Sequence, residues 1–169
     1  MWEIVFNFYS TNDLRYRYVR DIYFTEKKFI KKIKEFFKKE NISIKKVSDN
    51  IWFNKSDIKR LVKQGHTVGL HSHHHPSNLK KLDYEKKKKE YKKNLFYLKK
   101  ISNQDIISMS HPLNSYDRKT LHILKKLKIK CGFRSNIYID SNIKNINQSN
   151  LELAREDSTN IIKQIRKLK

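Results

Sequence analysis

From residue 56 onward, short apolar runs alternate with amphipathic helical patterns, and this alternation limits the choice of fold. The runs that predict strands are residues 67–70, 106–109, 131–134 and 151–154, and the patterns that predict helices are residues 56–64, 83–100, 118–127 and 158–169. Further upstream, Trp2–Tyr9 predicts a strand and Thr25–Glu40 an amphipathic helix. Strands separated by helices favour a parallel α/β sheet or barrel, in which functional groups gather at the carboxyl ends of the strands.

Five of the seven histidines lie within Gly65–Pro76, where one of the expected strands ends. Pro76 takes the chain out of regular structure just after His75. When a strand turns into a loop, His71 and His75 can converge on one metal ion of the zinc type. Two imidazoles do not complete a catalytic centre, which takes three protein ligands and keeps a position for water. By spacing alone, these histidines are also compatible with a loop that binds no metal.

Length and cysteine content bound the architecture and the compartment. The chain has 169 residues, 37% of them apolar, and no low-complexity linker, so we expect a single domain over residues 1–169. Its only cysteine, Cys131, excludes a disulfide within the chain, and we therefore predict a cytoplasmic protein. No apolar run approaches the roughly 20 residues that span a bilayer, so no membrane span is expected.

The charge of the chain is strongly positive, at +22 from 39 Lys and Arg against 17 Asp and Glu. Such a charge is compatible with a nucleic-acid partner. However, 31 of the basic residues are lysines spread along helical segments, whereas phosphate recognition favours clustered arginines. We attribute the charge to a compositional bias toward Lys, Ile and Asn, and we expect no specific nucleic-acid partner, only salt-sensitive binding to polyanions.

Three ordered blocks of residues resemble motifs of the polysaccharide deacetylase family. Residues 63–76, KQGHTVGLHSHHHP, are similar to the family's second motif, in which a strand delivers two histidine ligands. Residues 108–117, SMSHPLNSYD, followed by residues 130–134, KCGFR, resemble the family's Pro-Tyr-Gly turn and the strand after it. Residues 151–157, LELARED, resemble the last motif of members from bacterial surface-glycan gene clusters.

The resemblance implies a partial or distorted (β/α) barrel with parallel strands and outer helices, the C-terminal portion of a polysaccharide-deacetylase-like domain. It also implies a hydrolase that removes acetyl groups from an acetylated sugar or polysaccharide, cleaving a carbon–nitrogen bond other than a peptide bond. His71 and His75 would then hold a divalent metal, zinc by its ligand types, which activates water for attack on the acetyl carbonyl.

The same resemblance assigns further residues around the metal. The backbone N–H of Leu113 is the expected donor to the oxyanion, because it follows Pro112 in the turn. Ser72 is expected to anchor the histidine loop, and the alternative is an ordinary turn hydroxyl. Arg155 and Asp157 are expected either to line or brace the site or to form an ordinary structural ion pair.

The chain departs from the family pattern in its first motif, an Asp-Asp pair that supplies the general base and the third metal ligand. Asp13 is the nearest candidate for that ligand, although its segment resembles residues downstream of the motif, so we expect the N-terminal part of the barrel to be missing. The Pro-Tyr-Gly turn has become Pro112-Leu113-Asn114, and Ala154 replaces a proline in the last motif. The C-terminal histidine that many members use as general acid is absent.

Three hypotheses remain open at this point. In the first, the chain is a deacetylase or its C-terminal portion, and the missing carboxylates come from another segment or from a divergent residue such as Asp13. In the second, it is a degenerate deacetylase-like domain that binds glycan or metal without catalysis. In the third, it is a lysine-rich nucleic-acid-binding protein in which the histidine cluster is incidental. We favour them in that order.

Overall fold

The structure is a computed structural model that describes residues 9–135 and 149–167. The chain divides into two compact units, Met1–Asn54 and Lys55–Lys169, and each is described by itself. The expectation of a single domain over the whole chain stays a prediction. The strand expected at Trp2–Tyr9 lies outside the described residues except for Tyr9.

In its described residues, the first unit consists of helices and short connections and has no strand. Its elements are α1 (Thr11–Tyr18), a π-helical turn (Val19–Tyr23), α2 (Glu26–Lys39) and α3 (Ile44–Ile51), of which α3 was not expected. The Thr25 hydroxyl accepts a hydrogen bond from the Lys28 N–H and caps α2, as the sequence predicts. The aromatic and aliphatic stripe of α2 predicts a core-facing helix, but no residue of this helix is fully buried, and Phe36 is 50% exposed.

The second unit begins with α4 (Lys55–Lys63), which ends at Gly65 as the sequence predicts. The N–H of His66 donates to the Leu61 carbonyl and the N–H of Gly65 to the Val62 carbonyl, the Schellman arrangement that closes a helix. Gly65 has a φ of 88°, a left-handed conformation that glycine adopts without a steric penalty. The histidine-bearing segment follows directly after this turn.

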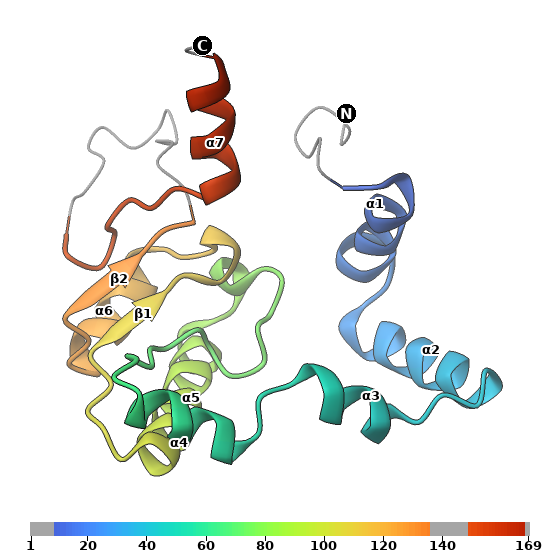
Figure 1. Cartoon of the computed structure of the whole chain (residues 1–169), viewed down its shortest axis with the longest axis horizontal. Coiled ribbons are helices and arrows are strands. Elements are labelled where there is room, and N and C mark those ends of the chain that lie inside the picture. The colour runs from blue at the N-terminus through green and yellow to red at the C-terminus, as the bar shows by residue number, and fades with distance from the viewer. Residues whose placement is uncertain (1–8, 136–148, 168–169) are drawn as a thin grey trace. The chain divides into compact units, whose positions relative to one another are not determined.

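Four chain segments pair in parallel in this unit. The strands β1 (Ser108–Ser110) and β2 (Cys131–Phe133) lie side by side, with Met109 opposite Gly132 (Figure 1). Single parallel bridges add Leu70 beside Met109 and Leu153 beside Phe133. The two outer strands expected from sequence are therefore present only as bridges. The parallel order with intervening helices confirms the predicted fold class, a partial α/β barrel.

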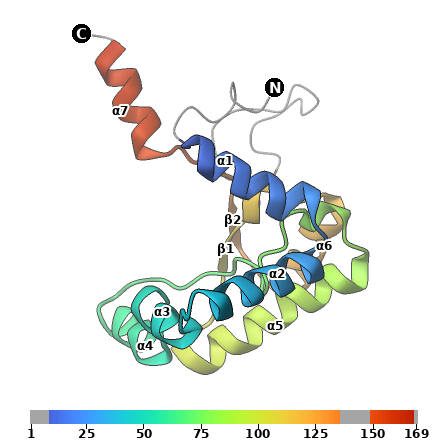
Figure 2. The ribbon, with the colours of Figure 1, turned by 90° about the vertical axis from the view of Figure 1, so that its right-hand side faces the viewer.

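Helices connect the parallel segments: α5 (Tyr84–Ser102) leads to β1, and α6 (Arg118–Lys126) joins β1 to β2. α7 (Ser158–Lys167) follows the last segment, and short 3-10 turns lie at Leu79–Lys81 and Pro112–Asn114. α5 packs against both α4 and α6, and α4 lies beside α5 in the two views of Figure 1 and Figure 2. In the described part of the chain, no helix is both long enough and apolar enough to cross a membrane.

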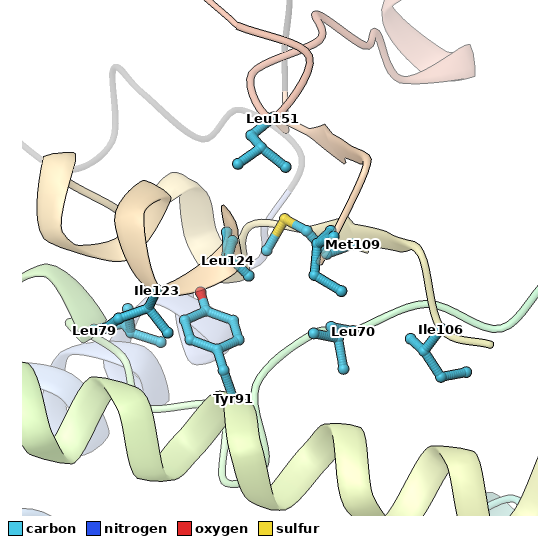
Figure 3. Close-up of a cluster of buried hydrophobic side chains, with 9 residues drawn as sticks. Leu70, Leu79, Tyr91, Ile106, Met109, Ile123, Leu124 and Leu151 are labelled. Carbon is cyan, nitrogen blue, oxygen red and sulfur yellow. The ribbon is translucent and has the colours of Figure 1, made fainter. Parts of the chain in front are cut away.

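The core of the second unit lies between the parallel segments and the helices. Figure 3 shows Leu70 and Met109 from the paired segments facing Tyr91 of α5 and the α6 residues Ile123 and Leu124. Tyr84, Leu95 and Leu98 of α5 pack against this cluster, so the apolar face predicted for that helix is confirmed. These contacts hold the parallel segments against α5 and α6.

One prediction about α5 is wrong. A run of four lysines, Lys86–Lys89, predicts a solvated helix face, but Lys87 is only 1% exposed. Its ammonium lies 2.6 Å from a carboxylate oxygen of Asp117, the residue that caps α6. A buried ammonium requires such a partner, because desolvation otherwise disfavours the charge.

Candidate functional site

A hollow of about 650 Å³ opens on the parallel segments of the second unit. It is lined by Thr67, Gly69, Leu70, His71, Ser108, Met109, Ser110, Cys131, Phe133 and Arg155. Gly69 and His71 flank the core residue Leu70 in one segment, and Ser108 and Ser110 flank Met109 in the next, because successive side chains of a strand point to opposite faces. His71 and Ser110 lie at the carboxyl ends of these two segments.

Gly69 permits the close approach of the histidine segment to β1. A Cβ atom at this position would lie 2.8 Å from the Ser108 hydroxyl oxygen and 3.0 Å from the Ser108 carbonyl oxygen. The Leu70 N–H donates to that same carbonyl, and the Ser110 N–H donates to the Leu70 carbonyl, both at 2.9 Å. These contacts bring the next residue, His71, beside Ser110.

The orientation of His71 is fixed by β1. Its Nδ1 atom lies 2.9 Å from the Ser110 carbonyl oxygen, so Nδ1 carries the proton and its N–H donates a hydrogen bond to that oxygen. Nε2 is then left with a free lone pair, as in metal-binding histidines whose other nitrogen is hydrogen-bonded to a carbonyl. Burial lowers the pKa of His71, the bond to Ser110 opposes this, and His75 and Arg155 lower it further. A neutral imidazole is the form that binds metal.

His75 returns to His71 through a tight loop. Ser72 and His75 have φ values of 60° and 52°, and the Ser72 hydroxyl accepts the His75 N–H at 3.1 Å. The Ser72 hydroxyl thus bonds within the loop, as an ordinary turn hydroxyl also does. The two imidazole centroids lie 4.9 Å apart. Two imidazoles on one tetrahedral zinc ion, with Zn–N distances of about 2.0–2.1 Å, place their centroids roughly 5 Å apart, so the pair fits a shared ion.

A third ligand is not evident in the described residues, where no group of three His, Cys, Asp or Glu is arranged to hold a metal ion. Asp13 belongs to the first unit, where its carboxylate accepts hydrogen bonds from the N–H and the hydroxyl of Ser10 at 3.2 and 2.6 Å. Those bonds lower the pKa of Asp13 and complete the capping box of α1. Its role as a ligand stays a prediction.

Leu113, whose N–H is predicted to be the oxyanion donor, lies in the 3-10 turn after β1. Leu113 has a φ of 49° and a side chain that is 52% exposed. Within residues 9–135 and 149–167, its N–H has no hydrogen-bond acceptor, whereas the Ser115 N–H donates to the Pro112 carbonyl. A left-handed backbone at a non-glycine residue is uncommon and costs free energy. Leu113 is not among the residues that line the hollow, and its role as a donor stays a prediction.

Arg155 and Asp157 have different surroundings. Arg155 lines the hollow, and its guanidinium donates to the Ser110 hydroxyl at 3.3 Å. The Asp157 carboxylate accepts the Thr159 N–H at 2.8 Å at the start of α7 and does not line the hollow. Among the predicted site residues, the structure therefore brings together His71, His75 and Arg155, while Asp157 acts locally as a helix cap.

Sequence reasoning missed a buried polar group beneath the turn. His111 is 2% exposed, its Nε2–H donates to the Leu151 carbonyl at 2.7 Å, and its ring stacks on Tyr116 with a centroid distance of 4.0 Å. Burial lowers the pKa of His111 and raises the pKa of Tyr116 to about 12. The signal in the sequence is a histidine directly before Pro112 at the end of a strand. The residue whose carbonyl accepts its hydrogen bond, Leu151, lies 40 residues away.

His73 and His74 lie between the two predicted ligands in the sequence, which predicts them to be spacers, and both face α5. The His73 ring stacks on Tyr97 at 5.3 Å and 17°, and the His74 Nδ1 lies 2.6 Å from an oxygen of Glu90. Neither histidine lines the hollow as it is described. The imidazoles of His71 and His75 thus lie next to each other, whereas those of His73 and His74 contact α5.

Comparison with known proteins identifies the relatives of the chain. A family model described as polysaccharide deacetylase matches residues 21–132. No curated protein sequence matches the chain. Among solved structures, a Streptococcus pyogenes deacetylase in complex with acetate is 27% identical, with a TM-score of 0.47 over 50% of this chain and 37% of that one. A CE4 family pseudoenzyme from Bacillus anthracis is 21% identical, with a TM-score of 0.43 over 57% and 35% of the two chains. The chain thus spans little more than a third of either structure.

Proposed function

Because the chain belongs to the polysaccharide deacetylase family, we propose that it takes part in the hydrolysis of acetyl groups from an acetylated sugar or polysaccharide. Water adds to the acetyl carbonyl, the carbon–nitrogen bond breaks, and acetate and a free amine are formed. The observation that carries the proposal is the approach of His71 and His75, whose ring centroids lie 4.9 Å apart at the end of parallel segments.

The two histidines would hold a divalent metal, with zinc favoured by the imidazole donors. When bound, such an ion supplies a Lewis acid for the carbonyl and lowers the pKa of water. The Ser110 carbonyl orients His71 for this role by accepting a hydrogen bond from its Nδ1–H. Asp13 is the proposed third ligand of this chain, and a carboxylate from outside the described residues is the other source.

Two further groups complete the proposed site. The Leu113 N–H would donate to the developing oxyanion, and removing such a donor typically costs about 2.7–4 kcal/mol of transition-state stabilisation. The Arg155 guanidinium, which lies on the hollow and donates to the Ser110 hydroxyl, would hold a polar group of the sugar or the acetyl oxygen. Asp157 contributes indirectly, because it caps α7 next to Arg155 along the chain.

A catalytically degenerate domain that binds glycan or metal is the second candidate. It is supported by one observation: no carboxylate joins the two histidines among the residues that the structure describes. Such a domain would keep the histidine pair and the hollow but would release no acetate.

The test uses the full chain with zinc. We expect about one equivalent of bound metal by elemental analysis and acetate release from chitooligosaccharides, and we expect His71→Ala and His75→Ala to abolish both. His66→Ala is the matched control, because His66 lies in the same segment but outside the loop. Metal content that is unchanged in both ligand variants would refute the assignment, and metal binding without acetate release would favour the degenerate domain.

Other parts of the proposal come from sequence alone. They are the surface-glycan context, a cytoplasmic location and the absence of a specific nucleic-acid partner. The last is tested by titrating single-stranded DNA at low and raised salt. We expect weak binding that disappears with salt, because lysine contacts with phosphate release counterions.

A further inference from the structure

We propose that Glu90 and Asn94 of α5 are positioning residues that hold the backbone of the histidine loop in the conformation that presents His71 and His75 to a metal. This inference rests on the proposed function, since it concerns the same two histidines. It adds two residues that the family motifs quoted above do not contain.

The loop is held to the helix through three backbone N–H groups. One carboxylate oxygen of Glu90 accepts the N–H of His73 at 3.0 Å and that of His74 at 2.8 Å. The amide oxygen of Asn94 accepts the N–H of His71 at 3.1 Å. Residues four apart on a helix lie on one face, so Glu90 and Asn94 reach successive parts of the same loop.

Glu90 makes a further contact with its second oxygen, which lies 2.6 Å from Nδ1 of His74. Its side chain is only 13% exposed, so these bonds lie partly out of water and carry more free energy than exposed ones. In the described part of the chain, both carboxylate oxygens of Glu90 bond to residues 73 and 74. Glu90 therefore replaces the hydrogen bonds that a regular strand or helix would give to this backbone.

The loop needs such a device because its conformation is unfavourable. Ser72 and His75 both adopt left-handed backbone angles, which cost free energy for residues other than glycine. Three charge-assisted or amide hydrogen bonds from a rigid helix offset that cost. The Ser110 carbonyl on one side and Asn94 on the other then fix the ring and the backbone of His71 separately.

The first test measures the loop without metal. Exchange of the His71, His73 and His74 amide protons is followed by NMR in the full chain. We expect Glu90→Ala to speed exchange at residues 73 and 74 at least tenfold, while Glu90→Gln, which keeps an oxygen acceptor, retains most of the protection. Asn94→Ala should act on His71 alone, and Asn94→Asp should rescue it.

The second test measures zinc affinity by competition with a chromophoric chelator. Loss of an outer contact of a metal site typically weakens binding about 10–100-fold, and we expect that range for Glu90→Ala and Asn94→Ala. Glu90→Gln should stay close to wild type. His74→Ala is the informative control, because it removes the side-chain contact but leaves both N–H groups for Glu90. Glu85→Ala, an exposed change on the same helix, should have no effect.

The two tests separate failure of this inference from failure of the proposed function. If wild type binds no zinc, or if His71→Ala does not alter its affinity, the metal proposal fails while the amide exchange still decides the role of Glu90 and Asn94. Unchanged amide protection in Glu90→Ala and Asn94→Ala overturns the inference. Wild-type zinc affinity in both folded variants overturns it as well, because the contacts would then be structural only.

Discussion

The ammonium of Lys87 lies 2.6 Å from a carboxylate oxygen of Asp117, and this ion pair joins α5 to the N-cap of α6. The Lys87 side chain is 1% exposed, whereas that of Asp117 is 26% exposed. Burial disfavours ionisation of Asp117, but hydrogen bonds from Lys87 and Thr120 outweigh it and keep the pKa of Asp117 below its usual range. The carboxylate is thus charged at neutral pH and compensates the buried ammonium.

Asp117→Ala is therefore expected to destabilise the protein strongly. It leaves the Lys87 ammonium buried without its carboxylate, which costs about 3 kcal/mol, and it removes the cap of α6, which costs about 1 kcal/mol. Urea unfolding of both proteins measures the loss.

Lys87→Met is the matched change on the other side of the pair. It keeps the apolar stem and removes the charge, while Asp117 retains its bonds to Thr120, so we expect a loss below about 1.5 kcal/mol. A larger loss for Lys87→Met than for Asp117→Ala would contradict this account of the pair.

Leu113→Gly is expected to preserve the site and stabilise the turn. Glycine adopts the left-handed φ of 49° without strain, and little packing is lost because half of the leucine side chain is exposed. We expect a gain of up to about 1 kcal/mol in unfolding free energy and unchanged acetate release, since the proposed donor is a backbone N–H. A large loss of activity in a stable variant would show instead that the leucine side chain acts on the substrate.

Much of this fold follows from local patterns in the sequence. The helices α2, α5 and α6 have apolar residues at helical spacing and polar caps, and they form where expected. The sequence predicts no helix at α3, although Ile44, Val47 and Ile51 recur at helical spacing. The segment has only eight residues, and its apolar residues are all β-branched and so favour strands. The outer strands shrink to bridges at Leu70 and Leu153, which have only one neighbouring segment in the described residues.

The helical spacing of Lys87 indicates a buried position, although the lysine run around it suggests an exposed one. It lies three residues after Tyr84 and four before Tyr91, on the face that packs into the core. The run of four lysines suggested solvent, but the helical spacing already placed one of them inside. The length of a lysine side chain then allowed its ammonium to reach Asp117.

The site was predictable only in part. The spacing of His71 and His75 and the loop hydroxyl of Ser72 identify a strand-to-loop turn in the sequence. The Ser110 carbonyl that orients His71 has no side-chain signature, and it comes from a segment 39 residues away. Contacts of this kind depend on strand register, which is set by the packing of the whole unit.

His111 is expected to make stability depend on pH. Its folded pKa lies below the ordinary value of about 6.5, mainly through burial. The unfolded chain therefore binds the proton more readily, so stability that is present above about pH 6.5 is lost as the pH falls through and below that value. His111→Gln keeps a donor for the Leu151 carbonyl but cannot titrate. Urea unfolding between pH 8 and pH 5 should show the advantage of wild type over the variant shrinking toward low pH. A constant or growing difference would mean that His111 does not titrate in this range.

Gly69→Ala is expected to disturb the site through the backbone. The new Cβ would meet the Ser108 hydroxyl at 2.8 Å and the Ser108 carbonyl at 3.0 Å, so the histidine segment must move away from β1. We expect a loss of about 1–3 kcal/mol in urea unfolding, as for other overpacked sites, and weaker zinc binding because His71 shifts from the Ser110 carbonyl. Adding Ser108→Ala removes the hydroxyl but not the carbonyl contact, so it should restore only part of both losses. Full restoration would place the strain in the hydroxyl alone, whereas wild-type zinc affinity in Gly69→Ala would show that the position of His71 does not depend on this close approach.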